Sequence, residues 1–463
     1  MFDITSADSI IEFAKKLEGQ TLRQAGGEAI KKHDYKGKGR FGQLLEKFYF
    51  RYEPNPSTEP DFEEAGIELK SSPLKILKNG ALRSKERLVL NIINYLEVYK
   101  EDFENSSFWK KNAHLLLVFY LYDKNLDLLD YLIKVVGSWR YPNEDLKIIK
   151  HDWEAINQKI KDGKAHELSE GDTFYLGACT KGSTAEKSYR SQPFSEEKAK
   201  QRAYSLKQGY VNHIIANIAQ ETTGVYGKII KQPEILDLVQ SIEEVVISRF
   251  QPFYGKSTEQ IRIELGLKLN PKAKSYFANL TNAILQLKLG QKIEEFEKAD
   301  IKVKTVRIKE NDLPKENISF PTFEYQELIE TDWEASSLKD ILESRFFFVF
   351  YQFERANLIL KKVKFWNMPH SDILEAKAVW DRTVETVSKG EIVEKVTSKG
   401  RRRTHFPKKK ENRICHVRPH ARDAADTHDL PVADKLTGVT KYTKHCFWLN
   451  ASYVRDEIYR HGA

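Results

Sequence analysis

The feature of this sequence that most restricts its fold is an internal repeat, because a chain that repeats its motifs in order builds tandem domains of one kind. Four segments recur in the same order at offsets between 227 and 238: FEEAGIELK (62–70) as FEKADIKVK (296–304), LLLVFYLYD (115–123) as FFFVFYQFE (346–354), DWEAINQKIKDGK (152–164) as VWDRTVETVSKGE (379–391), and GYVN (209–212) as FWLN (447–450). The repeat predicts two domains, which we place at residues 1–232 and 233–463.

Each half alternates helical segments with short runs of aromatic and β-branched residues. The runs HLLLVFY (114–120) and RFFFVFY (345–351) are short and typical of buried strands rather than helices. This alternation predicts an α/β fold in each half, with a mixed central sheet flanked by helices. A basic run, SKGRRRTHFPKKKENR (398–413), interrupts the second half and is predicted to be a loop.

In the first half, the segment GIELK at 66–70 alternates apolar and charged residues, as a half-buried strand does. Its apolar residues would enter the core, while Glu68 and Lys70 share the other face. Asp61 reaches that face if the chain turns shortly before the strand. Two carboxylates and an ammonium at one strand end can hold Mg²⁺ beside a phosphate.

A third carboxylate, Glu46, lies beside the apolar stripe of a predicted helix at 39–50. It is a candidate metal ligand or a residue that orients the metal's water. On this segment alone, a partly solvated helix glutamate is an equally good interpretation.

The repeat is chemically asymmetric at this place. The positions of Asp61 and Glu68 hold Glu295 and Lys302 in the second half, and Lys70 corresponds to Lys304. A lysine in place of Glu68 inverts the charge where the ion would sit. We therefore expect the first domain to catalyse and the second to bind DNA without metal chemistry.

Composition narrows the class of protein. No apolar run approaches the roughly 18 residues that span a bilayer, and the N-terminal segment is an amphipathic helix rather than a signal peptide. Three cysteines without a CxxC pair argue against a disulfide framework or a zinc site. We expect a cytoplasmic protein. The net charge of +8 permits a nucleic-acid partner without demanding one.

The motifs GRFGQLLE, PDFEEAGIELK, ENSSFWKKNAHLLLVFY and DWEAINQKIKDGK, in that order, resemble the mismatch-repair endonuclease MutH. They resemble still more closely the two-domain type II restriction endonucleases related to it, which cut at unmethylated GATC. This resemblance implies a bacterial, Mg²⁺-dependent deoxyribonuclease. It also implies a restriction-endonuclease-like core in each domain, the second a degenerate copy of the first.

The resemblance implies a role for each residue of the predicted site. Asp61 and Glu68 would bind the Mg²⁺ ion, and Glu46 would complete the metal site. Lys70 would position or deprotonate the attacking water. Lys111 would lie near the phosphate, with Lys110 as the alternative.

The resemblance also implies DNA-contacting residues. They are Lys38 and Gly39 in a groove-entering loop, Lys181, Tyr210 beside the adenine methyl group, and Arg418, His420 and Trp448 in the second domain, with Trp448 as the counterpart of Tyr210. Where the family has an arginine the first domain has Cys179, whereas the second domain retains an Arg-Pro-His stretch.

The expected partner is double-stranded DNA with GATC sites. Each enzyme would bind two copies of the site if the second domain is an allosteric effector domain. Dimerisation on DNA and a cognate adenine methyltransferase are further expectations. Two alternatives remain open: a mismatch-repair nicking endonuclease with the same chemistry, and a non-enzymatic DNA-binding regulator. The intact acid and lysine motifs argue against the regulator.

Overall fold

The computed structural model describes residues 2–27, 30, 41–53, 58–77, 79–181, 188–221, 226–232, 234 and 241–461. The chain divides into two compact units. The first comprises Met1–Ile242 and Gly290–Asp300, and the second comprises Glu243–Leu289 and Ile301–Ala463. A short segment of the second half of the sequence therefore packs with the first unit. Among the described residues, no helix combines the length and apolarity needed to cross a membrane.

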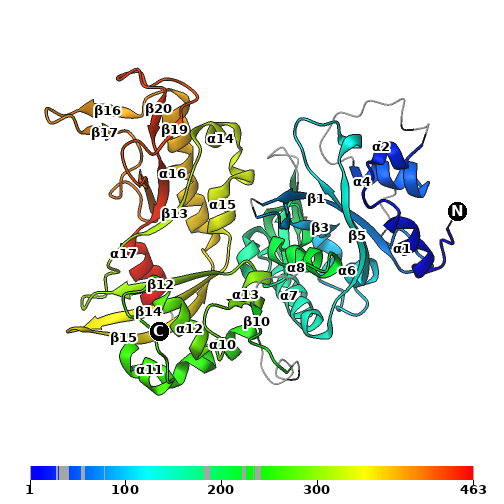
Figure 1. Cartoon of the computed structure of the whole chain (residues 1–463), viewed down its shortest axis with the longest axis horizontal. Helices are drawn as coiled ribbons and strands as arrows, with labels where there is room; N and C mark the ends of the chain where they lie inside the picture. The colour runs from blue at the N-terminus through cyan, green and yellow to red at the C-terminus, as the bar shows by residue number, and fades with distance from the viewer. Residues whose placement is uncertain are drawn as a thin grey trace. The chain divides into compact units, whose positions relative to one another are not determined.

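The first unit is built on a four-stranded mixed sheet in the order β2-β1-β4-β5 (Figure 1). Its strands are β1 (Glu68–Ile76), β2 (Leu82–Ser84), β4 (His114–Leu121) and β5 (Ile133–Arg140). β1 runs parallel to β4, and the other two pairs are antiparallel. The first six residues of β4 are buried, which confirms the predicted core strand.

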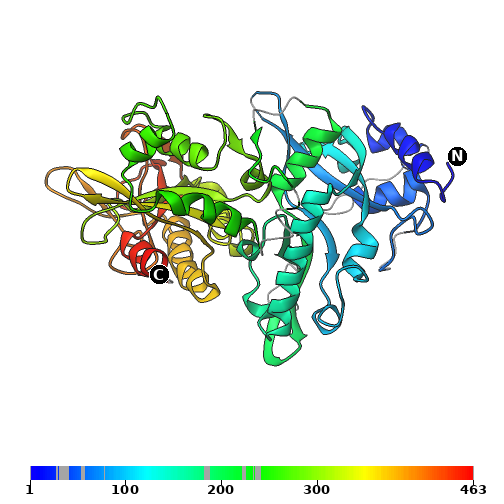
Figure 2. The same cartoon turned by 90° about the horizontal axis from the view of Figure 1, so that it is seen from below.

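Helices cover both faces of this sheet, as Figure 2 also shows from below. α1 (Ala7–Lys15) and α4 (Phe41–Leu44) share a core with Leu116 and Val118 of β4. α8 (Gln208–Ile218) lies on the opposite face, where Ile218 fills the space beside Gly137 of β5. The predicted mixed α/β fold is confirmed for this unit.

A second, antiparallel sheet completes the first unit in the order β3-β9-β6. The remaining elements that matter for the site are β3 (Leu88–Ile92), α5 (Tyr95–Val98), α6 (Ser107–Asn112), α7 (Asn143–Lys161), β6 (Leu176–Thr180), β9 (Arg202–Leu206) and α13 (Glu294–Lys298).

The second unit has a three-stranded mixed sheet, β12-β14-β15, and an antiparallel sheet, β13-β21-β18 (Figure 1). Its main elements are β12 (Lys302–Ile308), β13 (Ile318–Thr322), α14 (Tyr325–Glu330), α15 (Ser337–Leu342), β14 (Phe346–Glu354), β15 (Asn357–Trp366), α16 (His370–Ser388), β18 (Cys415–Pro419), β21 (His445–Leu449) and α17 (Ala451–Tyr453). β12 runs parallel to β14 and β14 runs antiparallel to β15, as β1, β4 and β5 do in the first unit.

The strand registers of the two units agree with the sequence repeat. Glu68 faces Leu115 across β1 and β4, and Lys302 faces Phe346 across β12 and β14. The repeat pairs Leu115 with Phe346, so Lys302 occupies the place of Glu68 in its own sheet. On the next strand of each sheet, Leu115 faces Trp139 and Phe346 faces Trp366.

The basic run at 398–413 is not entirely a loop, so that prediction was wrong in part. Arg402–Thr404 forms strand β17, which pairs with β16 (Val393–Val396) in an antiparallel hairpin. The charged side chains of the run masked its strand character, because arginine is tolerated on an exposed hairpin edge where the backbone supplies the pairing.

Candidate active site

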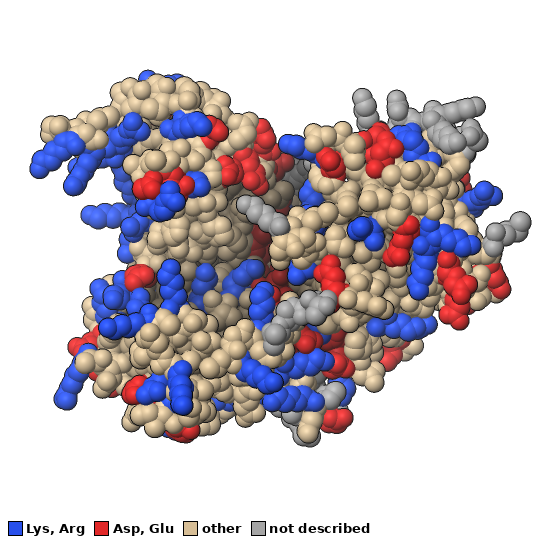
Figure 3. All heavy atoms as spheres, in the orientation of Figure 1, with Lys and Arg blue, Asp and Glu red and all other residues tan. Residues whose placement is uncertain are grey.

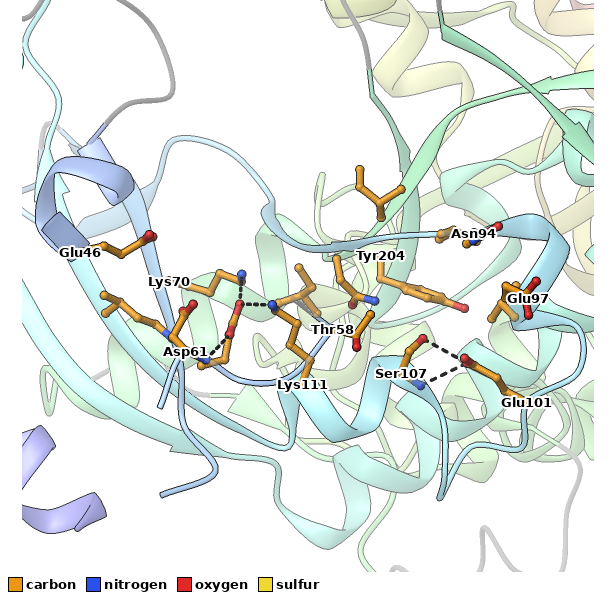
Figure 4. Close-up of a pocket in the computed structure, with 17 residues that line it drawn as sticks. Glu46, Thr58, Asp61, Lys70, Asn94, Glu97, Glu101, Ser107, Lys111 and Tyr204 are labelled. Atoms are coloured by element: carbon orange, nitrogen blue, oxygen red, sulfur yellow. Dashed lines mark hydrogen bonds and ion pairs between the residues drawn. The ribbon is translucent and has the colours of Figure 1, made fainter. Parts of the chain in front are cut away.

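A cavity of about 680 Å³ in the first unit contains all five predicted catalytic residues (Figure 4). Its walls come from the segment before β1, the start of β1, β3, α5 and α6. The predicted residues in its lining are Glu46, Asp61, Glu68, Lys70 and Lys111.

A tight turn places Asp61 beside the start of β1. The backbone of Phe62 pairs with that of Ile67, and Gly66 between them has a φ of +64°, which glycine adopts without strain. The amide of Asp61 donates to Glu68 Oε2 at 3.0 Å, and the amide of Leu69 donates to Asp61 Oδ2 at 2.9 Å. The turn therefore fixes both carboxylates from a segment of eight residues, as the sequence predicted.

Two lysines converge on the Glu68 carboxylate. Lys70 Nζ is hydrogen-bonded to Glu68 Oε1, and Lys111 Nζ lies 3.7 Å from the same oxygen. Lys111 also donates to the carbonyl of Glu59 at 3.1 Å. Lys110, the alternative for this role, is exposed and does not line the cavity.

The Glu68 side chain is almost completely buried, and this burial dominates its acidity. Burial raises the pKa of Glu68 to about 7; the Lys70 ammonium lowers it and Asp61 raises it further. Burial and the neighbouring Asp61 also raise the pKa of Glu46. Desolvation of these two carboxylates thus outweighs the effect of the two lysines.

Sequence reasoning missed several residues of this cavity. Tyr52 does not line the cavity but lies near its acids, and burial and these acids, Asp61 first among them, raise the pKa of its hydroxyl. The far end of the cavity is polar, and Ser107 donates from its amide and its hydroxyl to Glu101. Further polar residues of the lining outside the prediction include Thr58, Asn91, Asn94 and Glu97. They come from separate segments of the chain that the fold brings together, so no local motif signals them.

The residues fit a hard divalent cation, although they are not assembled around one. Among the described residues, no three His, Cys, Asp or Glu side chains are grouped as metal ligands. The predicted set, Glu46, Asp61 and Glu68, instead shares one cavity in which Lys70 holds Glu68. Carboxylate oxygens are the ligands that Mg²⁺ prefers. The raised pKa of Glu68 shows a buried carboxylate that a cation would stabilise.

The two predicted DNA-contacting residues of the first unit that the structure describes, Lys181 and Tyr210, do not line this cavity. Lys38 and Gly39 lie outside the described residues. Lys181 is partly exposed in the segment after β6, and Cys179 is buried within β6. Tyr210 is completely buried, and its hydroxyl donates to Asp145 at 3.0 Å. Its position does not support the predicted contact with an adenine methyl group.

The predicted correspondence of Tyr210 with Trp448 is wrong. Tyr210 is the third residue of helix α8, whereas Trp448 lies in strand β21. The residue placed like Tyr210 is Tyr453, the third residue of helix α17, whose hydroxyl donates to Asp372. Asp145 and Asp372 are each the third residue of a 19-residue helix, α7 and α16.

Three predicted residues of the second unit do come together. The Arg418 guanidinium lies 4.7 Å from the centre of the Trp448 ring, and the His420 ring lies 5.2 Å from it. Arg418 and His420 are exposed at the end of β18. A guanidinium stacked on an indole is held in a fixed orientation, which suits contact with a base edge.

A mixed α/β unit with an Asp and a Glu-x-Lys motif in one cavity defines the class of metal-dependent α/β endonucleases. A family model of the DNA mismatch repair enzyme MutH matches residues 50–152, which include most of this site. The chain is 39% identical to the type II restriction enzyme Sau3AI of Staphylococcus aureus over 96% of both chains.

Mismatch repair proteins MutH are more distant. Those of Shewanella woodyi and Vibrio parahaemolyticus are 27% and 26% identical, over 35% and 37% of this chain and 69% and 76% of their own. The chain belongs to the family of the type II restriction enzyme Sau3AI. The predicted membership of a MutH-like restriction endonuclease family is confirmed, as is the predicted enzyme class, a site-specific deoxyribonuclease.

Proposed function

We propose that this protein cuts double-stranded DNA at unmethylated GATC sites in a Mg²⁺-dependent reaction that leaves 5′-phosphate and 3′-hydroxyl ends. The observation that carries the proposal is the convergence of Asp61, Glu68 and Lys70 with Glu46 and Lys111 in one cavity. The GATC specificity rests on the family, and a cognate adenine methyltransferase would protect the host's own sites.

In this proposal, Asp61 and Glu68 hold Mg²⁺ with support from Glu46. When bound, the ion supplies polarisation of a phosphoryl oxygen and acidification of water. Lys70 and Lys111 point into the cavity from two elements, β1 and α6. Their ammonium groups stabilise the negative charge that develops on the phosphoryl oxygens in the transition state.

We further infer that the second unit is a diverged copy of the first that binds DNA as an effector. Support comes from the shared strand order and register and from the Arg418 cluster on β18 and β21. Efficient cutting would then need two GATC sites, one bound by each unit. Two chains can also dimerise on DNA that carries two such sites. A plasmid with one site should be cut slowly, and adding a short GATC duplex should accelerate the reaction.

The direct test is incubation of the full chain with supercoiled unmethylated plasmid and Mg²⁺. We expect a linear product with GATC at its ends, and protection when the adenine is N6-methylated. Asp61→Ala should abolish cutting, whereas the matched variant Glu64→Ala, on an exposed residue of the same turn, should cut normally. Uncut plasmid, or equal cutting by Asp61→Ala, would refute the proposal.

The second candidate is a mismatch-repair nicking endonuclease, which the MutH match over residues 50–152 supports. A nickase would convert the supercoiled plasmid to the open-circular form and stop there. The match of the restriction enzyme over 96% of the chain favours the double-strand reaction.

A further inference from the structure

The second unit has a cavity beside β12, the strand that corresponds to β1. In the first unit the cavity lies between β1 and β3. A cavity of about 200 Å³ lies between the counterpart strands, β12 and β13, and is lined by residues 304–307 and 315–319. Lys304, at the register position of Lys70, lines this hollow, and the rest of the hollow lies further along β12 than the active-site cavity lies along β1.

The charge of this hollow is the reverse of that in the first unit. Lys302 and Lys304 stand on one face of β12, at the register positions of Glu68 and Lys70. Lys304 lines the hollow together with Lys315 and Arg307, and Lys302 lies just outside this lining. The single lining acid, Glu316, is paired with Arg307 at 3.0 Å. Figure 3 shows Lys and Arg side chains gathered along this hollow over β12.

The acid expected at the Asp61 position does not belong to this hollow. Glu295 lies in α13, within the first unit, where its buried carboxylate accepts from the amides of Ile229 and Ile230 at 3.0 and 2.8 Å. Neither position that corresponds to Asp61 or Glu68 therefore offers this hollow a carboxylate that would hold a cation.

The two lysines of β12 have no counter-ion within the described part of the chain. Lys304 is half-buried, and neither it nor Lys302 pairs with a carboxylate there. Burial and the neighbouring Lys302 lower the pKa of Lys304. Two close ammonium groups, one of them partly desolvated, cost free energy unless an anion neutralises them.

The hollow continues onto the surface that carries the Arg418 cluster. Ser319 of β13 lines the hollow and faces Trp448 across β21. Trp448 in turn faces His416, and Arg418 lies two residues further on the same face of β18. An anion at the lysines would thus lie next to the stacked guanidinium, as a backbone phosphate lies next to a base edge.

We propose that this hollow binds a DNA phosphodiester without a metal ion, held by Lys304 in its lining and by Lys302 beside it, which stands at the register position of the Glu68 carboxylate. The site rests on the proposed effector function of the second unit and adds how that unit holds DNA: directly by ammonium groups, in the presence or absence of Mg²⁺. Catalysis needs the ion, whereas effector binding does not.

The test uses the full chain with Asp61→Ala, which prevents cutting, and a short GATC duplex with bromouracil in place of thymine. Ultraviolet cross-linking followed by mass spectrometry of the peptides locates the DNA in the first or the second unit. In EDTA we expect cross-links to peptides from residues 301–461. Adding Lys302→Ala and Lys304→Ala should lower their yield at least tenfold.

The matched control carries Lys389→Ala and Lys435→Ala, which remove the same charge from exposed lysines of the same unit that already pair with glutamates. It should cross-link normally. A second variant, Lys302→Gln with Lys304→Gln, keeps the side-chain length and should behave like the alanine pair, with an unchanged circular dichroism spectrum.

The outcomes separate the two proposals. Without cross-links to the second unit under any condition, the effector function itself fails. Cross-links that persist in the Lys302 and Lys304 variants overturn the lysine site alone. Cross-links that need Mg²⁺ or Ca²⁺ overturn its independence of metal.

Discussion

Replacing Glu68 by glutamine should stabilise the metal-free protein at alkaline pH while abolishing cutting. Burial raises the pKa of Glu68 from 4.5 to about 7. Between these pH values the native state binds more protons than the unfolded state, so stability falls as the pH rises through this window. Each pH unit between these two values lowers the free energy of unfolding by about 1.4 kcal/mol. Ionised Glu68 therefore destabilises the metal-free native state by about 3 kcal/mol above pH 7.

Glutamine keeps the acceptor for the Asp61 amide and does not titrate, so the variant avoids this cost. Thermal unfolding of the full chain in EDTA should show nearly equal melting temperatures for both proteins near pH 4.5. At pH 8 the variant should melt about 6–12 °C higher, since 1 kcal/mol shifts the melting of a unit of this size by about 2–4 °C. Saturating Mg²⁺ should stabilise the parent and leave the variant unchanged.

The matched control is Glu64→Gln, on an exposed residue of the same turn, which should shift melting little at either pH. A difference between Glu68→Gln and the parent that does not grow with pH would refute the reasoning. So would a variant that melts lower than the parent at pH 8.

Other positions give further predictions. Lys111→Ala should lower the cutting rate about 10²–10³-fold in a single-turnover assay, because a preorganised charge at the phosphate is lost. Exposed Lys110→Ala should change that rate less than about twofold. Asp152→Ala should destabilise the chain by about 3 kcal/mol in thermal unfolding, because the buried carboxylate accepts from three amides at 174–176. Gly209→Ala should lower the melting temperature as well, since its Cβ would lie 1.9 Å from a backbone carbonyl oxygen of α13.

The sequence predicted the part of the site that is local. Asp61, Glu68 and Lys70 lie within one turn and one strand, where alternation alone decides which side chains share a face. Their companions Asn91 and Ser107 enter the cavity from β3 and α6. Those contacts depend on long-range packing, which no periodicity encodes.

The error at Trp448 has a similar cause. The short motifs GYVN and FWLN align at an offset of 238, whereas the hydrogen bonds from Tyr210 and Tyr453 to their aspartates require an offset of 243. Four residues cannot reveal a shift of this kind. A buried hydroxyl with a carboxylate partner identifies the equivalent position directly, because its loss would leave a buried polar group unsatisfied.

The two units share a Tyr–Asp pair but differ at the register position of Glu68. The effect of each feature on the stability of the fold explains this difference. The Tyr–Asp pair joins a helix that follows a strand of the antiparallel sheet to the long helix in both units, Tyr210 with Asp145 and Tyr453 with Asp372. This pair stabilises the fold, so a unit that does not catalyse DNA cutting would also need it. Glu68 has the opposite effect on stability. Its buried charge weakens the metal-free fold, and only a bound cation offsets this cost, which is retained for the reaction. On the proposal that the second unit no longer cuts, no selection would retain such an acid, and a lysine at that register position serves phosphate binding instead.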